Sequence, residues 1–171
     1  MPRFTFDSIL SRGLRTLDRL AAPAPVHAHC DIPCGIYDPH LMQIAALTTI
    51  RMHQLIEGLQ GDDTATRNSF ARYILVKEEH AELAKREARV IWGDYFKPEH
   101  LEKHKDLHDV TWQIMKLGGK VRQSVDMQAA QDLLAATHKF AEIFWDTKGV
   151  QTKRQASNQG QAGGELVYPV S

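Results

Sequence analysis

Apolar residues recur at helical spacing in four successive segments that begin near residue 38. Within each segment they alternate between steps of three and four residues, which is the spacing of a helix with one buried face. Short breaks separate the segments, and none of them shows the every-second-residue alternation of a half-buried strand. This pattern predicts an all-α fold over residues 38–150, an up-down four-helix bundle with left-handed packing.

The predicted core consists of one stripe of residues on each helix. Asp38 and Pro39 mark the start of the first helix, because aspartate caps a helix and proline fits its first turn. Lys77 interrupts the second stripe, and we expect its side chain to snorkel toward water. The four stripes are Leu41, Ala45, Thr48, Met52, Leu55 and Leu59; Phe70, Ile74, Lys77, Ala81, Ala84, Ala88 and Ile91; Leu107, Val110, Ile114, Leu117 and Val121; and Leu133, Thr137, Phe140 and Phe144.

The two ends of the chain differ in composition from this predicted bundle. Residues 1–28 place leucines at helical spacing among arginines and then become rich in alanine and proline. We interpret this segment as a propeptide that is removed after Ala28, where small residues and prolines would suit a protease. An uncleaved N-terminal arm is the alternative. Residues 151–171 are polar and rich in glycine and glutamine, which predicts a disordered tail whose apolar stretch 166–170 is its only candidate for docking on a neighbour.

Charge and composition exclude several classes of function. The chain has 171 residues, with 21 Lys and Arg against 21 Asp and Glu, so its net charge is zero. It therefore has no basic field that would attract nucleic acid or an anionic membrane. No run approaches the roughly 18 consecutive apolar residues of a membrane-spanning helix. Arginines and an aspartate interrupt the leucines of residues 1–28, unlike the apolar core of a secretory signal, so the expected location is cytoplasmic.

The strongest chemical signal is the stretch His29–Tyr37, which we call the hook. It contains the only two cysteines of the chain, Cys30 and Cys34, and a histidine stands directly before the first. The two sulfurs can converge on one point, because a proline and a glycine favour a turn around the second cysteine. Two thiolates, an imidazole and their backbone nitrogens are a donor set that suits a thiophilic transition metal.

The hook, together with the Asp38-Pro39 that follows it, resembles the metal-binding hook of nickel superoxide dismutases. Residues 76–85, 92–100 and 143–148 resemble later segments of the same family. The resemblance covers roughly residues 29–149 and implies an enzyme that disproportionates superoxide to oxygen and hydrogen peroxide. It further implies one nickel ion per chain as the cofactor and a homohexamer of bundles as the assembly.

The resemblance implies that His29, Cys30 and Cys34 are the nickel ligands. Thiolates and a deprotonated backbone amide donate strongly enough to stabilise Ni(III), so that the metal can alternate between Ni(II) and Ni(III). A planar set of two nitrogens and two sulfurs also suits divalent nickel. One of these nitrogens is the amine of the histidine, which only a chain terminus offers. A maturation peptidase that cleaves after Ala28 is therefore an expected partner.

The resemblance also implies three catalytic residues that are not ligands. Tyr37 would stand over the open face of the metal, Tyr95 would be a second tyrosine lining the approach, and Lys97 would attract superoxide. Taken alone, Tyr95 and Lys97 also fit an ordinary corner between helices. Two positions depart from the family, since Ala45 and His80 stand where a glutamate and an arginine hold the axial imidazole.

Two other interpretations come from the residues themselves. His100, His104 and His108 recur every fourth residue and would form one helical stripe, for which a solvated polar face is preferred to a metal site. No histidine has the Glu-x-x-His spacing that a di-iron bundle requires. The alternative function is a non-enzymatic module, in which Cys30 and Cys34 bind zinc or copper or cycle between dithiol and disulfide.

Overall fold

The structure, a computed structural model, describes residues 35–170 of the chain. The structure is described for the second of the chain's two units, which spans Cys34–Ser171. The predicted propeptide of residues 1–28 lies outside the described residues. Within the second unit the elements are α2 (His40–Glu57), α3 (Thr64–Asp94), α4 (Pro98–Lys103), α5 (Leu107–Gln123), α6 (Met127–Thr147), β1 (Thr152–Ala156), the short 3-10 helix η1 (Gly160–Ala162) and β2 (Glu165–Pro169).

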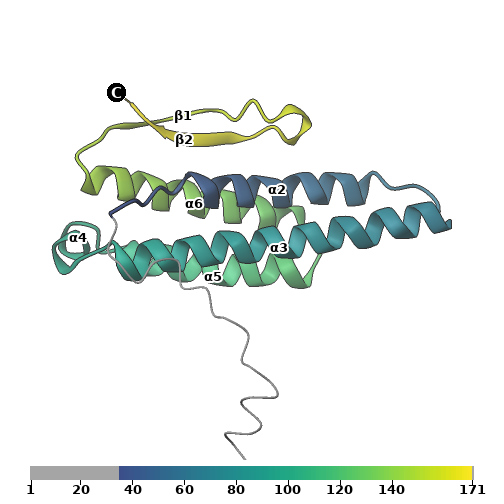
Figure 1. The fold of residues 1–171 in the computed structure, drawn as a ribbon, viewed down its shortest axis with the longest axis horizontal. Helices are drawn as coiled ribbons and strands as arrows, with labels where there is room; N and C mark the ends of the chain where they lie inside the picture. Colours follow the sequence, from purple (N-terminus) through teal and green to yellow (C-terminus); the bar gives the residue numbers. More distant parts are fainter. Residues whose placement is uncertain (1–34, 171) are drawn as a thin grey trace, which may run out of the picture. The chain divides into compact units, whose positions relative to one another are not determined.

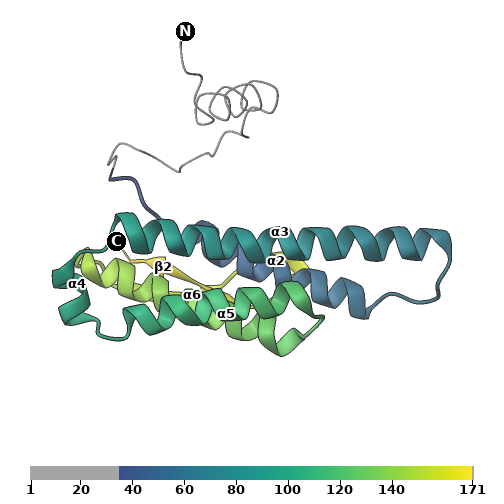
Figure 2. The same ribbon diagram turned by 90° about the horizontal axis from the view of Figure 1, so that it is seen from below.

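The helices α2, α3, α5 and α6 form the predicted four-helix bundle (Figures 1 and 2). Each packs against two others, so that contacts run from α2 to α3, on to α5, on to α6 and back to α2. Helices that follow one another in sequence are neighbours in space, which is the up-down arrangement. The predicted bundle is therefore confirmed. The short α4 lies at one end of it, between α3 and α5 (Figure 1).

Aspartate side chains fix the starts of three bundle helices. Asp63 accepts a hydrogen bond from the backbone of Thr66 at 2.8 Å, and Asp126 accepts one from Ala129 at 3.0 Å. At the start of α2, Asp38 accepts from the backbone N–H of His40 at 2.7 Å. Each bond satisfies an N–H group that has no partner within its own helix.

The predicted core stripes match the structure best on the later helices. All four predicted residues of α6 are buried, and so is the alanine-rich second half of the α3 stripe. On α2 the stripe is displaced, because Leu41 is 47% exposed whereas Met42 is completely buried. Besides Ala45 from the predicted stripe, α2 buries Gln43, Ala46, Leu47 and Ile50, so more than one of its faces is covered.

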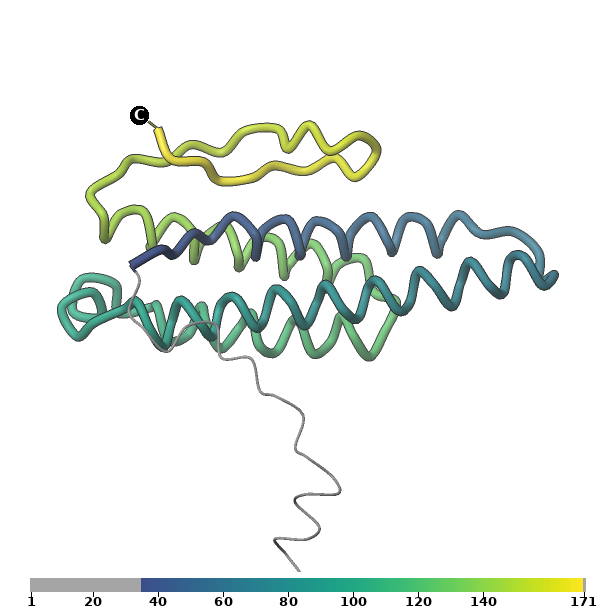
Figure 3. The backbone as a smooth tube through the Cα atoms, viewed as in Figure 1, coloured from purple at the N-terminus to yellow at the C-terminus, as the bar shows by residue number. Residues whose placement is uncertain are grey.

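The prediction of a disordered tail is wrong, because residues of this segment form an antiparallel hairpin. Strand β1 pairs with β2 in a register that places Thr152 opposite Pro169 and Ala156 opposite Glu165. The hairpin lies over α2 and α6 on the outside of the bundle (Figures 1 and 3). Leu166 and Val167 are buried, so the apolar end of the tail docks on its own chain and supplies the free energy that a polar sequence alone would lack.

One stripe of α2, which we call the hairpin-facing stripe, holds the hairpin along its length. It consists of His40, Gln43, Leu47, Arg51 and Gln54, whose steps of three and four residues put them on one side of the helix. Arg51 donates to the Gln161 side chain at 2.8 Å, and Gln54 donates to the Ala162 carbonyl at 3.3 Å. This stripe is largely polar, so its sequence has the same pattern as a helix face exposed to solvent.

The centre of this stripe pairs with the hairpin backbone. The completely buried Gln43 accepts a hydrogen bond from the N–H of Val167 at 2.8 Å and donates to the Val167 carbonyl at 3.2 Å. The primary amide thereby forms the two backbone hydrogen bonds that a neighbouring strand would form at the edge of β2. Both backbone groups would otherwise be buried without partners, which costs about 1–3 kcal/mol for each group.

Lys77 does not snorkel to water as its place in the stripe suggested. Its side chain is 1% exposed, and its ammonium donates to the carbonyls of Val121, Arg122 and Ser124 at the end of α5. Burial lowers the pKa of Lys77, and the neighbouring Glu78 offsets part of this effect. The lysine therefore caps the C-terminus of another helix, where the carbonyls lack partners and favour a positive charge.

Replacing Lys77 with methionine tests this cap, because methionine keeps the apolar stem and removes the donor. We expect K77M to lower the free energy of unfolding by about 2–3 kcal/mol, since several buried carbonyls lose their partner. Chemical denaturation would measure the change. The matched control is K105M, at an exposed lysine just before α5, which should change stability by less than about 0.5 kcal/mol. Equal effects of the two substitutions would contradict the cap.

His138 on α6 gives the hairpin a dependence on pH. Its Nε2 lies 2.8 Å from the Glu165 carbonyl, to which a neutral imidazole donates. Burial lowers the pKa of His138 below its ordinary value of 6.5, and the nearby Arg154 lowers it further, against the raising effects of the hydrogen bond to Glu165 and of Glu142. The unfolded chain therefore binds the proton first, so stability falls as the pH drops below about 6.5.

We expect H138Q, which keeps a donor for Glu165 but cannot titrate, to lose less stability between pH 7.5 and pH 5.5 than the unmodified chain. Denaturant titrations at both pH values would measure the difference. The control is Q131A, at an exposed residue of the same helix that does not titrate, which should leave the pH dependence unchanged. An identical pH dependence of H138Q and the unmodified chain would contradict this role of His138.

Candidate metal centre

The end of the hook emerges beside the bundle at the start of α2. Gly35, Ile36 and Tyr37 are described, whereas the ligand candidates His29, Cys30 and Cys34 lie outside the described residues. Gly35 has φ +73°, a conformation that L-residues other than glycine rarely adopt. A glycine at this point therefore lets the chain turn where the hook meets the bundle.

Tyr37 and Tyr95, two of the predicted catalytic residues, lie against each other. Their ring centroids are 5.8 Å apart with an angle of 54° between the planes. Tyr95 follows the last residue of α3, and its backbone N–H closes that helix by donating to the Ile91 carbonyl at 3.1 Å. The fold thus brings together two tyrosines that are far apart in sequence, at the end of the bundle where the hook joins α2.

Aromatic rings hold Tyr95 on several sides. The ring of His100 is stacked on it at 5.5 Å, and the rings of Phe96 and Phe144 lie at 5.1 and 4.7 Å. Pairs at such distances stabilise one another by about 0.5–1.5 kcal/mol beyond the area that they bury. The orientation of the tyrosine is therefore set by packing before any metal or substrate arrives.

The hydroxyl proton of Tyr95 is donated in a hydrogen bond within the protein. Its oxygen lies 2.8 Å from Thr147 Oγ1, and the Thr147 hydroxyl itself donates to the Phe144 carbonyl at 2.7 Å. Since a threonine hydroxyl has one proton, Tyr95 must be the donor to Thr147. The lone pairs of the tyrosine oxygen remain available to accept hydrogen bonds.

A lysine that the sequence analysis did not select lies beside these rings. Lys148 Nζ is 5.3 Å from the centre of the Tyr95 ring and 5.1 Å from that of Phe144, both within the range of a cation–π contact. Lys97, the predicted attractor of superoxide, is exposed just after Tyr95 at the start of α4. The position of Lys148 within the family-like segment 143–148 was the signal that could have identified it.

The predicted histidine stripe does not exist, because the helix breaks within it. His100 belongs to α4, His104 has the non-helical angles φ −116° and ψ 76°, and His108 belongs to α5. Each has a different partner: His100 stacks on Tyr95, His104 lies 2.7 Å from an Asp146 carboxylate oxygen, and His108 accepts from the Trp92 indole at 3.0 Å. Within residues 35–170, no three His, Cys, Asp or Glu side chains are grouped to hold a metal ion.

The two positions that depart from the family lie in different surroundings. Ala45 is completely buried in the bundle core. His80 is half-buried on α3, where its Nδ1 lies 2.9 Å from the Val76 carbonyl, and it lines an open surface hollow with Glu79 and Arg122. Neither residue repeats the carboxylate or the guanidinium that the resemblance leads us to expect.

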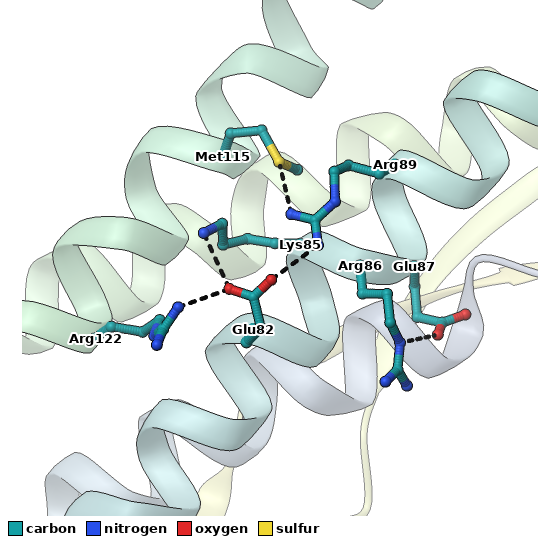
Figure 4. A network of polar contacts seen from close by, with 7 residues as sticks. All are labelled: Glu82, Lys85, Arg86, Glu87, Arg89, Met115 and Arg122. Carbon is teal, nitrogen blue, oxygen red and sulfur yellow. Dashed lines mark hydrogen bonds and ion pairs between the residues drawn. The ribbon is translucent and has the colours of Figure 1, made fainter. Parts of the chain in front are cut away.

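A network around Glu82 joins α3 to α5 near this hollow (Figure 4). The carboxylate pairs with Lys85 at 3.1 Å and with Arg89 and Arg122 at 2.8 Å each. Burial acts to raise the pKa of Glu82, but the hydrogen bonds from Arg89 and Lys85 outweigh it and hold the pKa below its usual value. These charges therefore pair with one another, and the network stabilises the packing of α3 against α5.

The chain is similar to known proteins over most of its length. A family model described as nickel-containing superoxide dismutase matches residues 24–148. The nickel superoxide dismutase of Streptomyces coelicolor is 38% identical over 133 residues, which make up 77% of this chain and 98% of that protein. The corresponding protein of Streptomyces seoulensis is 37% identical over the same shares of the two chains.

Solved structures give the same result at the level of the fold. The native structure of nickel superoxide dismutase has a TM-score of 0.63 and 37% identity, and the match covers 70% of this chain and 99% of that one. A structure with nickel ligation corresponding to the oxidised state also has a TM-score of 0.63, with 35% identity over 71% and 99% of the two chains. The chain therefore belongs to the nickel-containing superoxide dismutase family.

Proposed function

We propose that His29, Cys30 and Cys34 hold one nickel ion per chain, and that the protein uses it to disproportionate superoxide into oxygen and hydrogen peroxide. Membership of the family makes nickel the cofactor and superoxide the substrate. The observation that carries the proposal is the extent of the family match, which begins at residue 24 and so contains the whole hook.

The donor set of the hook fits nickel. Two thiolates are soft anionic donors, and a backbone amide and an amine complete a set that suits a tetragonal divalent ion. When bound, nickel supplies the alternate acceptance and donation of one electron. Cleavage after Ala28 by a maturation peptidase would create the amine at His29, so we propose that processing and metal loading are coupled.

The described residues have roles in orientation and in attraction of the anion. Tyr37, packed on Tyr95, would restrict the approach to the hook so that only small anions pass, and the lone pairs of the Tyr95 oxygen would accept hydrogen bonds from water on that approach. Lys97 and Lys148 place positive charge at this end of the bundle, which raises the local concentration of an anionic substrate. Two observations support these roles. The rings of Tyr37 and Tyr95 are in contact, and Lys148 lies over the Tyr95 ring while Lys97 follows Tyr95 closely in sequence.

Exposed apolar side chains support the proposed homohexamer. Phe70, Leu75 and Trp92 on α3 and Trp112 on α5 are all between 40% and 61% exposed. Trp92 and Trp112 line one surface hollow together with Met115, and exposed apolar side chains that lie together in this way are typical of an interface with another protein. We propose that copies of this chain cover them.

Several further proposals concern the setting of the protein. We propose a cytoplasmic location, because reactive thiolates fit a reducing compartment. The zero net charge supports an enzyme that binds neither nucleic acid nor anionic membrane. Among the described residues, no helix combines the length and the apolar character needed to cross a bilayer. The alternative of a non-enzymatic zinc, copper or dithiol module is disfavoured, because the family match includes both cysteines.

The proposal is tested by nickel content and superoxide removal in proteins that differ only at the N-terminus. We expect the protein that begins at His29 to bind one nickel ion per chain and to remove superoxide, and the full chain to do neither. The matched control begins at Ala28, one residue earlier, and keeps every side chain of the hook. Equal behaviour of all three would show that the amine is not a ligand. Nickel binding without activity would instead point to Ala45 and His80.

Tyr95 is tested by Y95F in the protein that begins at His29. The ring contacts survive and the bond to Thr147 is lost, so we expect stability to fall by about 1 kcal/mol. Nickel content should be unchanged, while the second-order rate constant for superoxide falls by about fivefold, the equivalent of one hydrogen bond. Pulse radiolysis would measure the rate constant, with T147V as a control for loss of the same bond. An unchanged rate constant in Y95F would contradict this role and would show that Tyr95 contributes only its packing.

A further inference from the structure

Aromatic contacts hold the chain on both sides of the junction between the hook and α2. On one side the Tyr37 ring packs against Tyr95 at 5.8 Å. On the other side the ring of His40 packs against Tyr168 of strand β2, with centroids 5.4 Å apart and an angle of 43° between the planes. Tyr168 lies beyond residue 148, where the match to the family ends, so the second contact comes from a part of the chain outside that match.

The short connection between these two contacts is stiff. Pro39 is buried and has a ring that restricts its backbone, with φ −77°. Asp38 accepts from the N–H of His40 at 2.7 Å, which ties the cap to the first residue of α2. A change in the position of His40 is therefore passed to Tyr37 rather than absorbed between them.

The hairpin gives Tyr168 a fixed position. The neighbouring Val167 is bound on both backbone groups by Gln43, and Leu166 is completely buried. The end of the hairpin is closed by the N–H of Val170, which donates to the Gln151 carbonyl at 2.8 Å. Tyr168 therefore meets His40 from a strand that is itself held along its length.

We propose that Tyr168 is a positioning residue for the metal centre. By packing on His40 it fixes the direction in which the chain leaves α2 toward the hook, and it thereby keeps Tyr37 against Tyr95. The consequence for catalysis rests on the proposed function, but the structural effect does not, because it concerns residues 35–40 without any metal.

The first experiment uses the full-length, metal-free chain and compares Y168A, Y168F and the unmodified protein by NMR. In Y168A we expect the amides of His40 and Gln43 to exchange with solvent about fivefold faster, as loss of one aromatic contact implies. The cross-peaks between the rings of Tyr37 and Tyr95 should weaken. Y168F should restore both readouts, because it keeps the ring.

The control is K153A, at the residue that faces Tyr168 across the hairpin and is exposed to solvent. It should leave the amide exchange and the ring cross-peaks unchanged, and amides in the middle of α3 should exchange equally in all variants. Unchanged exchange at His40 and Gln43 in Y168A, with Val167 still protected, would overturn the proposal. So would equal effects of Y168A and K153A.

A second experiment separates this inference from the proposed function. In the protein that begins at His29, nickel is titrated and the nickel–thiolate absorption is recorded for the same variants. We expect Y168A to alter this absorption and to bind nickel more weakly, and Y168F to behave like the unmodified protein. If none of them binds nickel, the proposed function fails while the metal-free result stands. Identical spectra and affinities in Y168A and the unmodified protein would overturn the role at the metal centre.

Discussion

Helix α2 has to be buried on more than one side, and most of the architecture depends on this constraint. Its inner face contributes Ala45 and Met42 to the bundle core, while its hairpin-facing stripe contacts the C-terminal strands. The same helix begins directly after the hook, so the chain that carries the ligand candidates leaves from an element fixed by both layers. A helix with one solvated face would leave this starting point held by the bundle alone.

The bundle could be predicted from the sequence because each helix buries a continuous stripe at one period. Phe140 and Phe144 on α6 are buried as predicted, and the alanines of α3 pack closely against the neighbouring helices. The hairpin was missed for a physical reason. Its contacts on α2 run largely through Gln43, Arg51 and Gln54, and polar side chains at helical spacing have the same pattern whether they face water or a docked strand.

The parts of the candidate site that could be predicted are those whose residues match the sequence pattern of the family. The resemblance paired Tyr37 with Tyr95, which lie in contact, although the sequence offers no local reason for them to meet. The histidine stripe failed because regular spacing implies a common face only on an unbroken helix, and the chain breaks at His104. The cap that Lys77 supplies depends on the end of another helix, which no local pattern reveals.

The direction of β2 has a consequence for handling the protein. Because Tyr168 lies against the first residue of α2, the C-terminal end of the hairpin is at the same end of the bundle as the tyrosine pair. An affinity tag or fusion partner attached after Val170 would therefore emerge at the end of the bundle where Tyr37 packs on Tyr95. The turn that contains η1 lies at the opposite end of the hairpin, over the later turns of α2. A label inserted there would be remote from the tyrosine pair.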